Sequence, residues 1–345
     1  MRELIERLYR EQTLAPGELR TLLLECRGED LDFLMQKARA VAQSHFGNRI
    51  YIRGLIEIGN CCHNDCFYCG IRKSNRHLKR YRLDAETILA CCRHGYELGF
   101  RTFVLQGGED NYMNDDRVTE VVTAIRTEFP DVAITLSLGE RPTLSYKRFF
   151  QAGANRYLLR HETHNEAHYR RLHPEDMSLS NRLRCLKRIG FQTGTGIMVG
   201  SPGQTVDHLV EDILFIEQFR PQMIGIGPFL PHHDTPFASC PPGSLTQTLT
   251  LLSIFRLLHP QALIPSTTAL ASLTPDGREK GILAGANVVM PNLSPVEQRK
   301  NYALYDNKAS MGSEAAEGLR LLAQRLAAIG YEIDKSRGDY PGKTL

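Results

Sequence analysis

The first part of the chain is patterned for helices. Residues 1–47 carry apolar side chains at three- and four-residue spacing in the runs LIERLYR, PGELRTLLLEC and DLDFLMQKARAVAQ. Pro16 opens the second run, and proline is favoured in the first turn of a helix because its missing N–H would have no partner there. We therefore expect residues 1–47 to form an N-terminal helical segment.

The period changes after Asn48, where short β-branched runs alternate with helical patterns. The runs that predict strands are 51–58, 102–106, 132–138, 156–160, 195–199, 223–229, 262–267 and 286–290. The patterns that predict the following helices are 84–98, 115–128, 144–151, 179–189, 206–218, 245–258, 277–283 and 315–329. Strands that alternate with helices of this length indicate parallel pairing.

Eight such units predict an α/β fold, a (β/α)8 TIM-type barrel over residues 48–331, with residues 332–345 as a C-terminal tail. A doubly wound open sheet is the alternative, because periodicity alone does not separate the two. In a barrel the carboxyl ends of the strands converge on one face, which carries the site. Here those ends read GNCCHNDC, QGGED, SLGE, RHETH, VGSPGQT, GPFLPHHD, STTA and MPN.

Composition and charge narrow the class of protein. The chain has 345 residues, a net charge of +3 and no long basic run, which argues against nucleic acid as the main partner. No stretch reaches the roughly 18 apolar residues of a membrane span. The N-terminus MRELIERLYREQ carries acidic residues and does not resemble a signal or transit peptide. We expect a cytoplasmic protein without a membrane partner.

The cysteines carry the clearest chemical signal. Of nine in the chain, four lie between Cys61 and Cys69, and three of them form the pattern Cys62-x3-Cys66-x2-Cys69. Thiolates at this spacing on a loop suit one soft metal centre. A 4Fe-4S cluster normally takes four cysteines, so three would leave one iron open to a small molecule. The alternative is a structural zinc site in which Cys61 or His63 supplies a fourth ligand.

We interpret the histidines and the cysteines outside this motif as structural residues. Adjacent side chains on an extended segment point to opposite sides, which is poor for chelation, so we interpret His232 and His233 as loop residues. We interpret His161 and His164 as structural or as supporting the site residues. The remaining cysteines on helical patterns are expected to be small buried apolar residues.

The cysteine loop and the strand ends resemble a known family. The loop after the first strand resembles that of the radical S-adenosylmethionine (SAM) superfamily. The segments IEIGNCCHNDCFYCGIRKSNRHLKRYRL, VLQGGED, TLSLGE, RYLLRHET, MVGSPGQT, IGIGPFLPHHDTP, IPSTTA and GANVVMPNLSP together resemble the HydE family of [FeFe]-hydrogenase maturases, close to methylornithine synthase and biotin synthase. The similarity runs from about residue 50 to residue 305.

The resemblance implies cofactors and site residues. It implies that Cys62, Cys66 and Cys69 hold one 4Fe-4S cluster, and that SAM binds its open iron. No cysteine follows Cys240, so no accessory C-terminal cluster is expected. The residues implied in SAM binding are Tyr68, Gln106, Gly108, Ser137, Glu162, Arg182 and Met198. The residues implied in substrate binding are Arg160, Thr267, Thr268, Met290, Tyr302 and Tyr305.

Arg160 also has an argument of its own. It follows the apolar strand RYLL, and a charge buried there is costly unless it meets an anion. A carboxylate ligand would supply that anion. The alternative is an internal salt bridge with Glu140 or Glu162.

The resemblance implies reductive cleavage of SAM to a 5′-deoxyadenosyl radical and a role in assembling the diiron subsite of the hydrogenase H-cluster. The implied substrate is a cysteine-bound Fe(CO)2CN unit from the partner maturase HydG, and the implied reductant is a low-potential electron donor. One alternative is a radical SAM mutase similar to methylornithine synthase. A sulfur insertion similar to that of biotin synthase would need a second cluster. A zinc-stabilised binding scaffold is the alternative from a different class.

Overall fold

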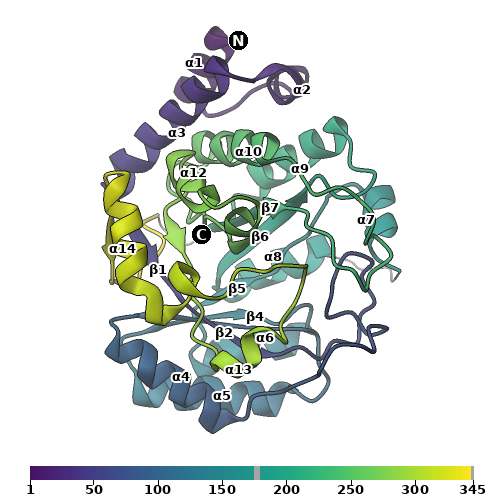
Figure 1. Ribbon diagram of the computed structural model, residues 1–345, viewed down its shortest axis with the longest axis vertical. Helices are drawn as coiled ribbons and strands as arrows, with labels where there is room; N and C mark the ends of the chain where they lie inside the picture. Colours follow the sequence, from purple (N-terminus) through teal and green to yellow (C-terminus); the bar gives the residue numbers. More distant parts are fainter. Residues whose placement is uncertain (175–178, 343–345) are drawn as a thin grey trace.

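The chain folds into a ring of parallel strands surrounded by helices (Figure 1). The computed structural model describes residues 1–174 and 179–342. Its strands are β1 (Arg49–Ile52), β2 (Gly54–Gly59), β3 (Thr102–Gly107), β4 (Ala133–Ser137), β5 (Arg156–Leu158), β6 (Gln192–Val199), β7 (Met223–Pro228), β8 (Val288–Val289) and β9 (Glu332–Asp334).

The helices occupy the segments between these strands and at the two ends of the chain. They are α1 (Arg2–Glu11), α2 (Pro16–Glu25), α3 (Glu29–Phe46), α4 (Ala85–Glu97), α5 (Asp115–Glu128), α6 (Thr143–Ala152), α7 (Glu166–Leu172), α8 (Leu179–Ile189), α9 (Val206–Phe219), α10 (Leu245–Leu258), α11 (Thr268–Leu273), α12 (Gly277–Leu283), α13 (Val296–Arg299) and α14 (Leu319–Ala328). Short 3-10 turns cover Gly312–Glu314 and Ala316–Gly318.

The strands close into a barrel. Strands β2 to β7 pair in parallel in chain order. From β7 the ring continues through bridges at Leu263 and Pro265 to Val288, and β8 then pairs with β1. An open doubly wound sheet would leave two unpaired edges, whereas the ring formed by the described residues has none. The predicted (β/α)8 barrel is therefore confirmed.

Two predicted strands differ in detail from the observed ones. The run 51–58 is divided at Arg53 into β1 and β2, and the run 262–267 makes bridges without forming a regular strand. Pro265 lies in the second run, and proline has no N–H to donate to a ladder. The short helices α7, α11 and α13, of seven, six and four residues, were not predicted.

The predicted N-terminal helices form and pack against one side of the barrel. Helix α3 lies along α10, and α2 packs on α9 (Figure 1). Their apolar stripe is buried: Leu8, Leu19, Leu22 and Leu34 are each fully inaccessible and belong to the main core. Burial of this stripe explains the three- and four-residue spacing in the sequence.

The end of the chain runs under the amino ends of the strands. Strand β9 pairs in parallel with β1. The carbonyl of Arg337 accepts a hydrogen bond from Thr102 Oγ1 at 2.8 Å, and Asp339 lies 2.7 Å from the buried guanidinium of Arg156. These contacts close the end of the barrel opposite to the cysteine loop.

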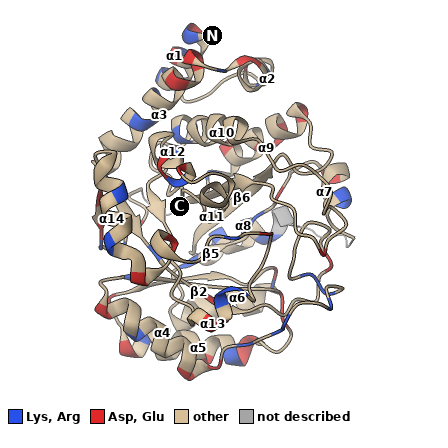
Figure 2. Ribbon diagram, viewed as in Figure 1, with Lys and Arg blue, Asp and Glu red and all other residues tan. Residues whose placement is uncertain are grey.

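The outer surface carries charges of both signs on most helices (Figure 2). Among the described residues, no helix is both long and apolar enough to cross a membrane.

Candidate functional site

A cavity of about 280 Å³ opens at the carboxyl ends of the strands. The segments after β2, β3, β4, β5, β6 and β7 all contribute to its wall. The predicted site residues in its lining are Cys62, Cys66, Tyr68, Cys69, Gln106, Gly108, Ser137, Arg160, Glu162, Met198, Thr267, Tyr302 and Tyr305. Residues that are far apart in sequence therefore meet at one end of the barrel, where such folds carry their sites.

The three cysteines of the motif line one wall of this cavity. They lie on the loop between β2 and α4, whose shape is held by Arg80, since its guanidinium donates to the carbonyls of Asn60, Ile71, Arg72 and Asn75 at 2.5–2.9 Å. Burial raises the pKa of Cys69 to about 12 and also raises that of Cys62. Thiolates at these positions would need a cation to offset the burial, which is what a bound metal centre provides.

Two glycines leave room beside the loop. A Cβ atom on Gly108 would lie 2.4 Å from the carbonyl oxygen of Cys61 and 2.7 Å from Cβ of Cys62. Gly139 has a φ of +71°, and a Cβ there would lie 2.1 Å from Cγ of Glu109. These positions take only glycine, because the neighbouring backbone and side chains already fill the space where a Cβ would be.

Arg160 and Glu162 form an ion pair in the cavity wall. Arg160 Nη2 donates to Glu162 Oε2 and to the carbonyl of Ile197, both at 2.8 Å. This is the internal salt bridge that was the alternative to a carboxylate ligand. Yet Arg160 Nε is buried without a hydrogen-bond partner, so the guanidinium keeps one donor for a ligand.

Glu162 is held in an unusual backbone conformation. Its φ is +59°, in the left-handed region that residues other than glycine seldom adopt. Backbone bonds on both sides hold it: its N–H donates to the carbonyl of Gly196 at 3.0 Å, and its carbonyl accepts from the N–H of Met198 at 3.2 Å. Burial raises the pKa of its carboxyl group, and Arg160 opposes that rise. Such strain often marks a functional position.

Tyr68 is positioned by His173. The tyrosine hydroxyl lies 3.1 Å from His173 Nε2, and the two rings meet edge to face with centroids 5.4 Å apart. Burial lowers the pKa of His173 to about 4, so this imidazole is neutral at physiological pH. A neutral ring can fix the orientation of Tyr68 without adding charge beside the cysteines.

A buried network supports the far wall of the cavity. Gln106 Nε2 donates to the hydroxyl of Tyr302 at 3.3 Å, and the ammonium of Lys308 lies 5.1 Å from the centre of the Tyr302 ring. Lys308 is paired with Glu57, a fully buried carboxylate on β2 that also accepts from Asn292 Nδ2 at 3.0 Å. Glu57 thus anchors the segment after β8 that carries the cavity tyrosines.

The lining of the cavity omits three of the predicted residues. Arg182 on α8 lies 3.5 Å from Glu140 and is partly exposed. Thr268 is the first residue of α11, directly after the lining residue Thr267. Met290 packs lower in the barrel, against a small apolar cluster that includes Met223 and Val288.

Several wall and support residues were not predicted. Glu109 and His173 line the cavity, while Glu57 and Arg80 hold its walls in place. For Glu57 a signal existed, because a single carboxylate within the apolar run LIEIG is costly to bury without a partner. Glu109 also had a signal, because it lies in the strand end QGGED. Arg80 and His173 carry no local signal, since the role of Arg80 depends on how its loop folds and that of His173 on Tyr68, far away in the chain.

The zinc alternative has little geometric support. The thiol of Cys61 donates to the carbonyl of Tyr81 at 3.9 Å, and His63 Nε2 lies 3.6 Å from a carboxylate oxygen of Glu109. Neither residue is in the cavity lining with the three cysteines of the motif. A closed four-ligand site would need one of them to move there.

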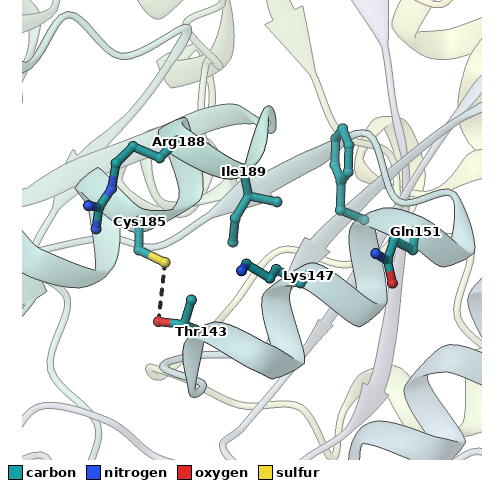
Figure 3. Close-up of a pocket in the computed structure, with 7 residues that line it drawn as sticks. Thr143, Lys147, Gln151, Cys185, Arg188 and Ile189 are labelled. Carbon is teal, nitrogen blue, oxygen red and sulfur yellow. Dashed lines mark hydrogen bonds between the residues drawn. The ribbon is translucent and has the colours of Figure 1, made fainter.

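A second hollow lies outside the barrel, between α6 and α8 (Figure 3). It measures about 610 Å³ and contains none of the predicted site residues. Cys185 Sγ donates to Thr143 Oγ1 at 3.3 Å across it, and the side chains of Lys147 and Arg188 lie along its sides. It brings together no set of reactive groups comparable to that of the central cavity.

The central cavity fits a soft metal centre with a polar ligand beside it. Three half-buried thiols supply the soft donors, and Gly108 leaves the backbone open next to them. Arg160 Nε and Thr267 Oγ1 are buried polar atoms without a partner in the described chain. Orphaned donors of this kind indicate a bound group with acceptor atoms.

Comparison with known proteins agrees with this fit. Residues 56–216 match the model of the radical SAM superfamily. A crystal structure of methylornithine synthase superposes with a TM-score of 0.84 at 27% identity, covering 96% of this chain and 97% of that one. The chain is therefore a radical SAM enzyme, a class that uses a 4Fe-4S cluster and SAM.

Relatives in sequence identify the family to which the chain belongs within this superfamily. The [FeFe] hydrogenase maturase subunit HydE of Thermotoga maritima is 43% identical over 340 residues, 98% of this chain and 97% of that protein. The 3-methylornithine synthase of Methanosarcina barkeri is 30% identical over 324 residues, 92% of this chain and 90% of that protein. The chain belongs to the HydE family within the superfamily, which excludes the zinc-stabilised scaffold.

Proposed function

We propose that this enzyme acts in the assembly of the diiron subsite of an [FeFe]-hydrogenase, on a cysteine-bound Fe(CO)2CN unit. The observation that carries the proposal is 43% identity to a HydE maturase along nearly the whole of both chains. The partly satisfied Arg160 in the cavity supports a substrate with a carboxylate, as a cysteine-bound unit has. HydG is the proposed source of that substrate, and a low-potential protein is the proposed electron donor.

Each wall of the cavity has a proposed role. Cys62, Cys66 and Cys69 would hold a single 4Fe-4S cluster, since no cysteine follows Cys240 to bind another. When bound, the cluster and SAM together supply a 5′-deoxyadenosyl radical. The backbone at Gly108 would let SAM approach the cluster loop closely, and the carboxylate of Glu162 would accept hydrogen bonds from ribose hydroxyls.

The remaining proposed SAM contacts come from around the rim. Tyr68 and Met198 would flank the adenine, with Gln106 and Ser137 on neighbouring strand ends. Arg182 would have to leave Glu140 to reach a SAM carboxylate, and the separation of 3.5 Å in that pair leaves it loosely held.

The deeper wall is proposed for the substrate. Arg160 Nε and Thr267 Oγ1 would bind the carboxylate end, and Tyr302 and Tyr305 would close the space around the iron unit and exclude water. Thr268 and Met290 are proposed to shape this region from behind the lining, where the structure places them.

The direct test is maturation in vitro. Protein reconstituted anaerobically with iron and sulfide is added, with SAM, a reductant and the partner maturases, to an apo-hydrogenase, and hydrogen production is measured. Activation by the native protein and none by Cys66→Ala is expected. The electron paramagnetic resonance spectrum of the reduced cluster should change when SAM is added. Failure to activate the hydrogenase with an intact, SAM-responsive cluster would contradict the proposed substrate while leaving the enzyme class in place.

A mutase activity is the second candidate, because methylornithine synthase resembles this chain in sequence and in structure. The same reconstituted protein incubated with lysine and SAM distinguishes the two. Formation of methylornithine without hydrogenase activation would replace the maturase proposal with the mutase.

A further inference from the structure

The histidines at the strand ends fall into two pairs. His232 and His233 lie in the turn after β7, and their rings stack with centroids 4.4 Å apart. The expectation that they point to opposite sides is therefore wrong, because the chain turns here instead of staying extended. His161 and His164 lie after β5, on either side of the carboxylate proposed to bind ribose. Both contact Asp212, a carboxylate on helix α9.

Asp212 is fully buried and has few partners. Its Oδ1 accepts the backbone N–H of His164 at 2.5 Å and lies 3.5 Å from His161 Nε2. Its Oδ2 accepts no hydrogen bond from the described part of the chain. A carboxylate that is buried and only partly satisfied is costly for stability. This cost favours a role for Asp212 in shaping the site over a role in the core alone.

Helix α9 holds the two histidines in more than one way. His161 Nδ1 lies 2.8 Å from Thr195 Oγ1 on β6, which sets the ring so that Nε2 faces Asp212. Phe215, one turn after Asp212, contacts both rings: it stacks on His164 with centroids 4.3 Å apart and meets His161 near edge to face at 4.8 Å. The segment on each side of the turn is therefore fixed to the same helix.

The residue between these contacts is Glu162, whose φ is +59°. Its own backbone bonds, to Gly196 and Met198, fix where it lies along β6. Asp212 fixes the residues before and after it. A hydrogen bond to a charged acceptor is at least comparable to the cost of one left-handed residue, so Asp212 can hold the turn in this conformation. Without it, the turn could relax and the carboxylate of Glu162 would move.

We propose that Asp212 is a positioning residue for SAM: it holds the turn of residues 161–164 so that the carboxylate of Glu162 faces the cavity. Asp212 itself does not line the cavity, whereas Glu162 does, so Asp212 acts through Glu162. The inference rests on the proposed contact between Glu162 and the ribose of SAM, and it adds a residue on a distant helix to that contact.

The test measures the equilibrium binding of SAM to anaerobically reconstituted, oxidised protein by isothermal titration calorimetry. Asp212→Ala should weaken SAM binding by about tenfold or more, with unchanged iron content. Asp212→Asn keeps an oxygen acceptor for the N–H of His164 and should stay within about threefold of the native affinity. Asp207→Ala removes an exposed carboxylate of the same helix and is the matched control, which should bind SAM as the native protein does.

A double-mutant cycle with Glu162→Ala shows whether Asp212 acts through that residue. Glu162→Ala should itself weaken SAM binding, and adding Asp212→Ala should cost no further affinity, because the carboxylate to be positioned is gone. Equal losses from Asp212→Ala in both backgrounds would overturn the inference and leave the ribose contact in place. Native affinity in Glu162→Ala would contradict the ribose contact, and the inference with it.

A second variant serves if Asp212→Ala is too unstable to purify. His161→Phe keeps a ring against Phe215 but loses the contacts with Thr195 and Asp212. It should weaken SAM binding in the native background and leave it unchanged in the Glu162→Ala background. Equal weakening in both backgrounds, or none in either, would count against the positioning role.

Discussion

Gly108 shows how a single residue shapes the site. Its backbone passes so close to Cys61 and Cys62 that even a methyl group would overlap a carbonyl oxygen, which has no freedom to rotate away. Arg160 and Glu162, which pair with each other in the cavity wall, show a different case. Here the carboxyl group of Glu162 is buried and its backbone is held at a positive φ, and both features cost free energy of folding. Left-handed backbone strain of this kind is typical of residues that bind a ligand.

Gly108→Ala should damage the cluster site without unfolding the barrel. The added Cβ must push the cysteine loop away by several tenths of an ångström or more, so iron content after reconstitution and the SAM-dependent spectral change should both fall. Gly17→Ala is the matched control, because a Cβ there meets nothing within 4 Å. Normal iron binding and SAM response in Gly108→Ala would show that the loop is not in close contact at this point.

Arg160→Ala should lower substrate turnover while leaving the cluster intact. The cluster and uncoupled SAM cleavage should persist, while substrate turnover should fall by about tenfold to a hundredfold, the loss expected for one charged hydrogen bond of roughly 1.5–3 kcal/mol. Steady-state kinetics with iron analysis checks this, and loss of the cluster or of the fold would show that Arg160 is structural.

At the scale of elements, the barrel is held by ion pairs that join segments far apart in the chain. Arg278 on α12 and Glu314 in a 3-10 turn after β8 are both buried, and they form a two-fold hydrogen-bonded pair. Glu57 and Lys308 form a single ion pair between β2 and the segment that carries the cavity tyrosines. Such pairs fix which segments meet more than they add to stability.

Arg278→Met should lower the free energy of unfolding by about 3–5 kcal/mol, because it leaves the Glu314 carboxylate buried without a partner. The double variant Arg278→Met with Glu314→Gln should recover much of that loss. Arg148→Met, which breaks an exposed pair with Asp116, should cost no more than about 1 kcal/mol. Urea unfolding of the four proteins measures these differences, and equal losses in the single and double variants would contradict the account.

At the scale of the whole molecule, the two ends of the barrel have different structural roles. The carboxyl ends of the strands surround the cavity, while the amino ends are closed by the last residues of the chain. Arg156 lies fully buried at that closed end, where it donates to the carbonyls of Arg337 and Gly338 and pairs with Asp339. The segment predicted as a tail therefore includes residues that complete the barrel.

Asp339→Asn should destabilise the protein at neutral pH, because Arg156 loses its counter-charge. Burial of Asp339 opposes its ionisation, but the contact with Arg156 prevails and lowers its pKa below the usual value. The stabilisation by Asp339 is thus present above the ordinary pKa of about 4 and is lost as the pH falls through the lowered value. Unfolding free energies of native and Asp339→Asn protein should converge on acidification. A difference that is constant with pH would contradict this assignment.

Local patterns in the sequence determined much of this protein. Helical spacing predicted the N-terminal helices, the alternation of short strands and helices predicted the barrel, and the cysteine spacing predicted the metal chemistry. These features are encoded by neighbouring residues, since periodicity and loop ligands act within a few positions of one another. The strand ends also placed most of the cavity lining, because a barrel brings those ends together.

Only the tertiary structure decided which distant groups meet. The pairing of Glu57 with Lys308 and the closure of the barrel by residues 337–339 join segments with no shared local pattern. The same holds for Arg182 and Met290, which lie outside the cavity lining, and for His164 and Asp212, which join the turn after β5 to helix α9. Spacing along the chain specifies local geometry, whereas contacts across the barrel depend on how every element packs.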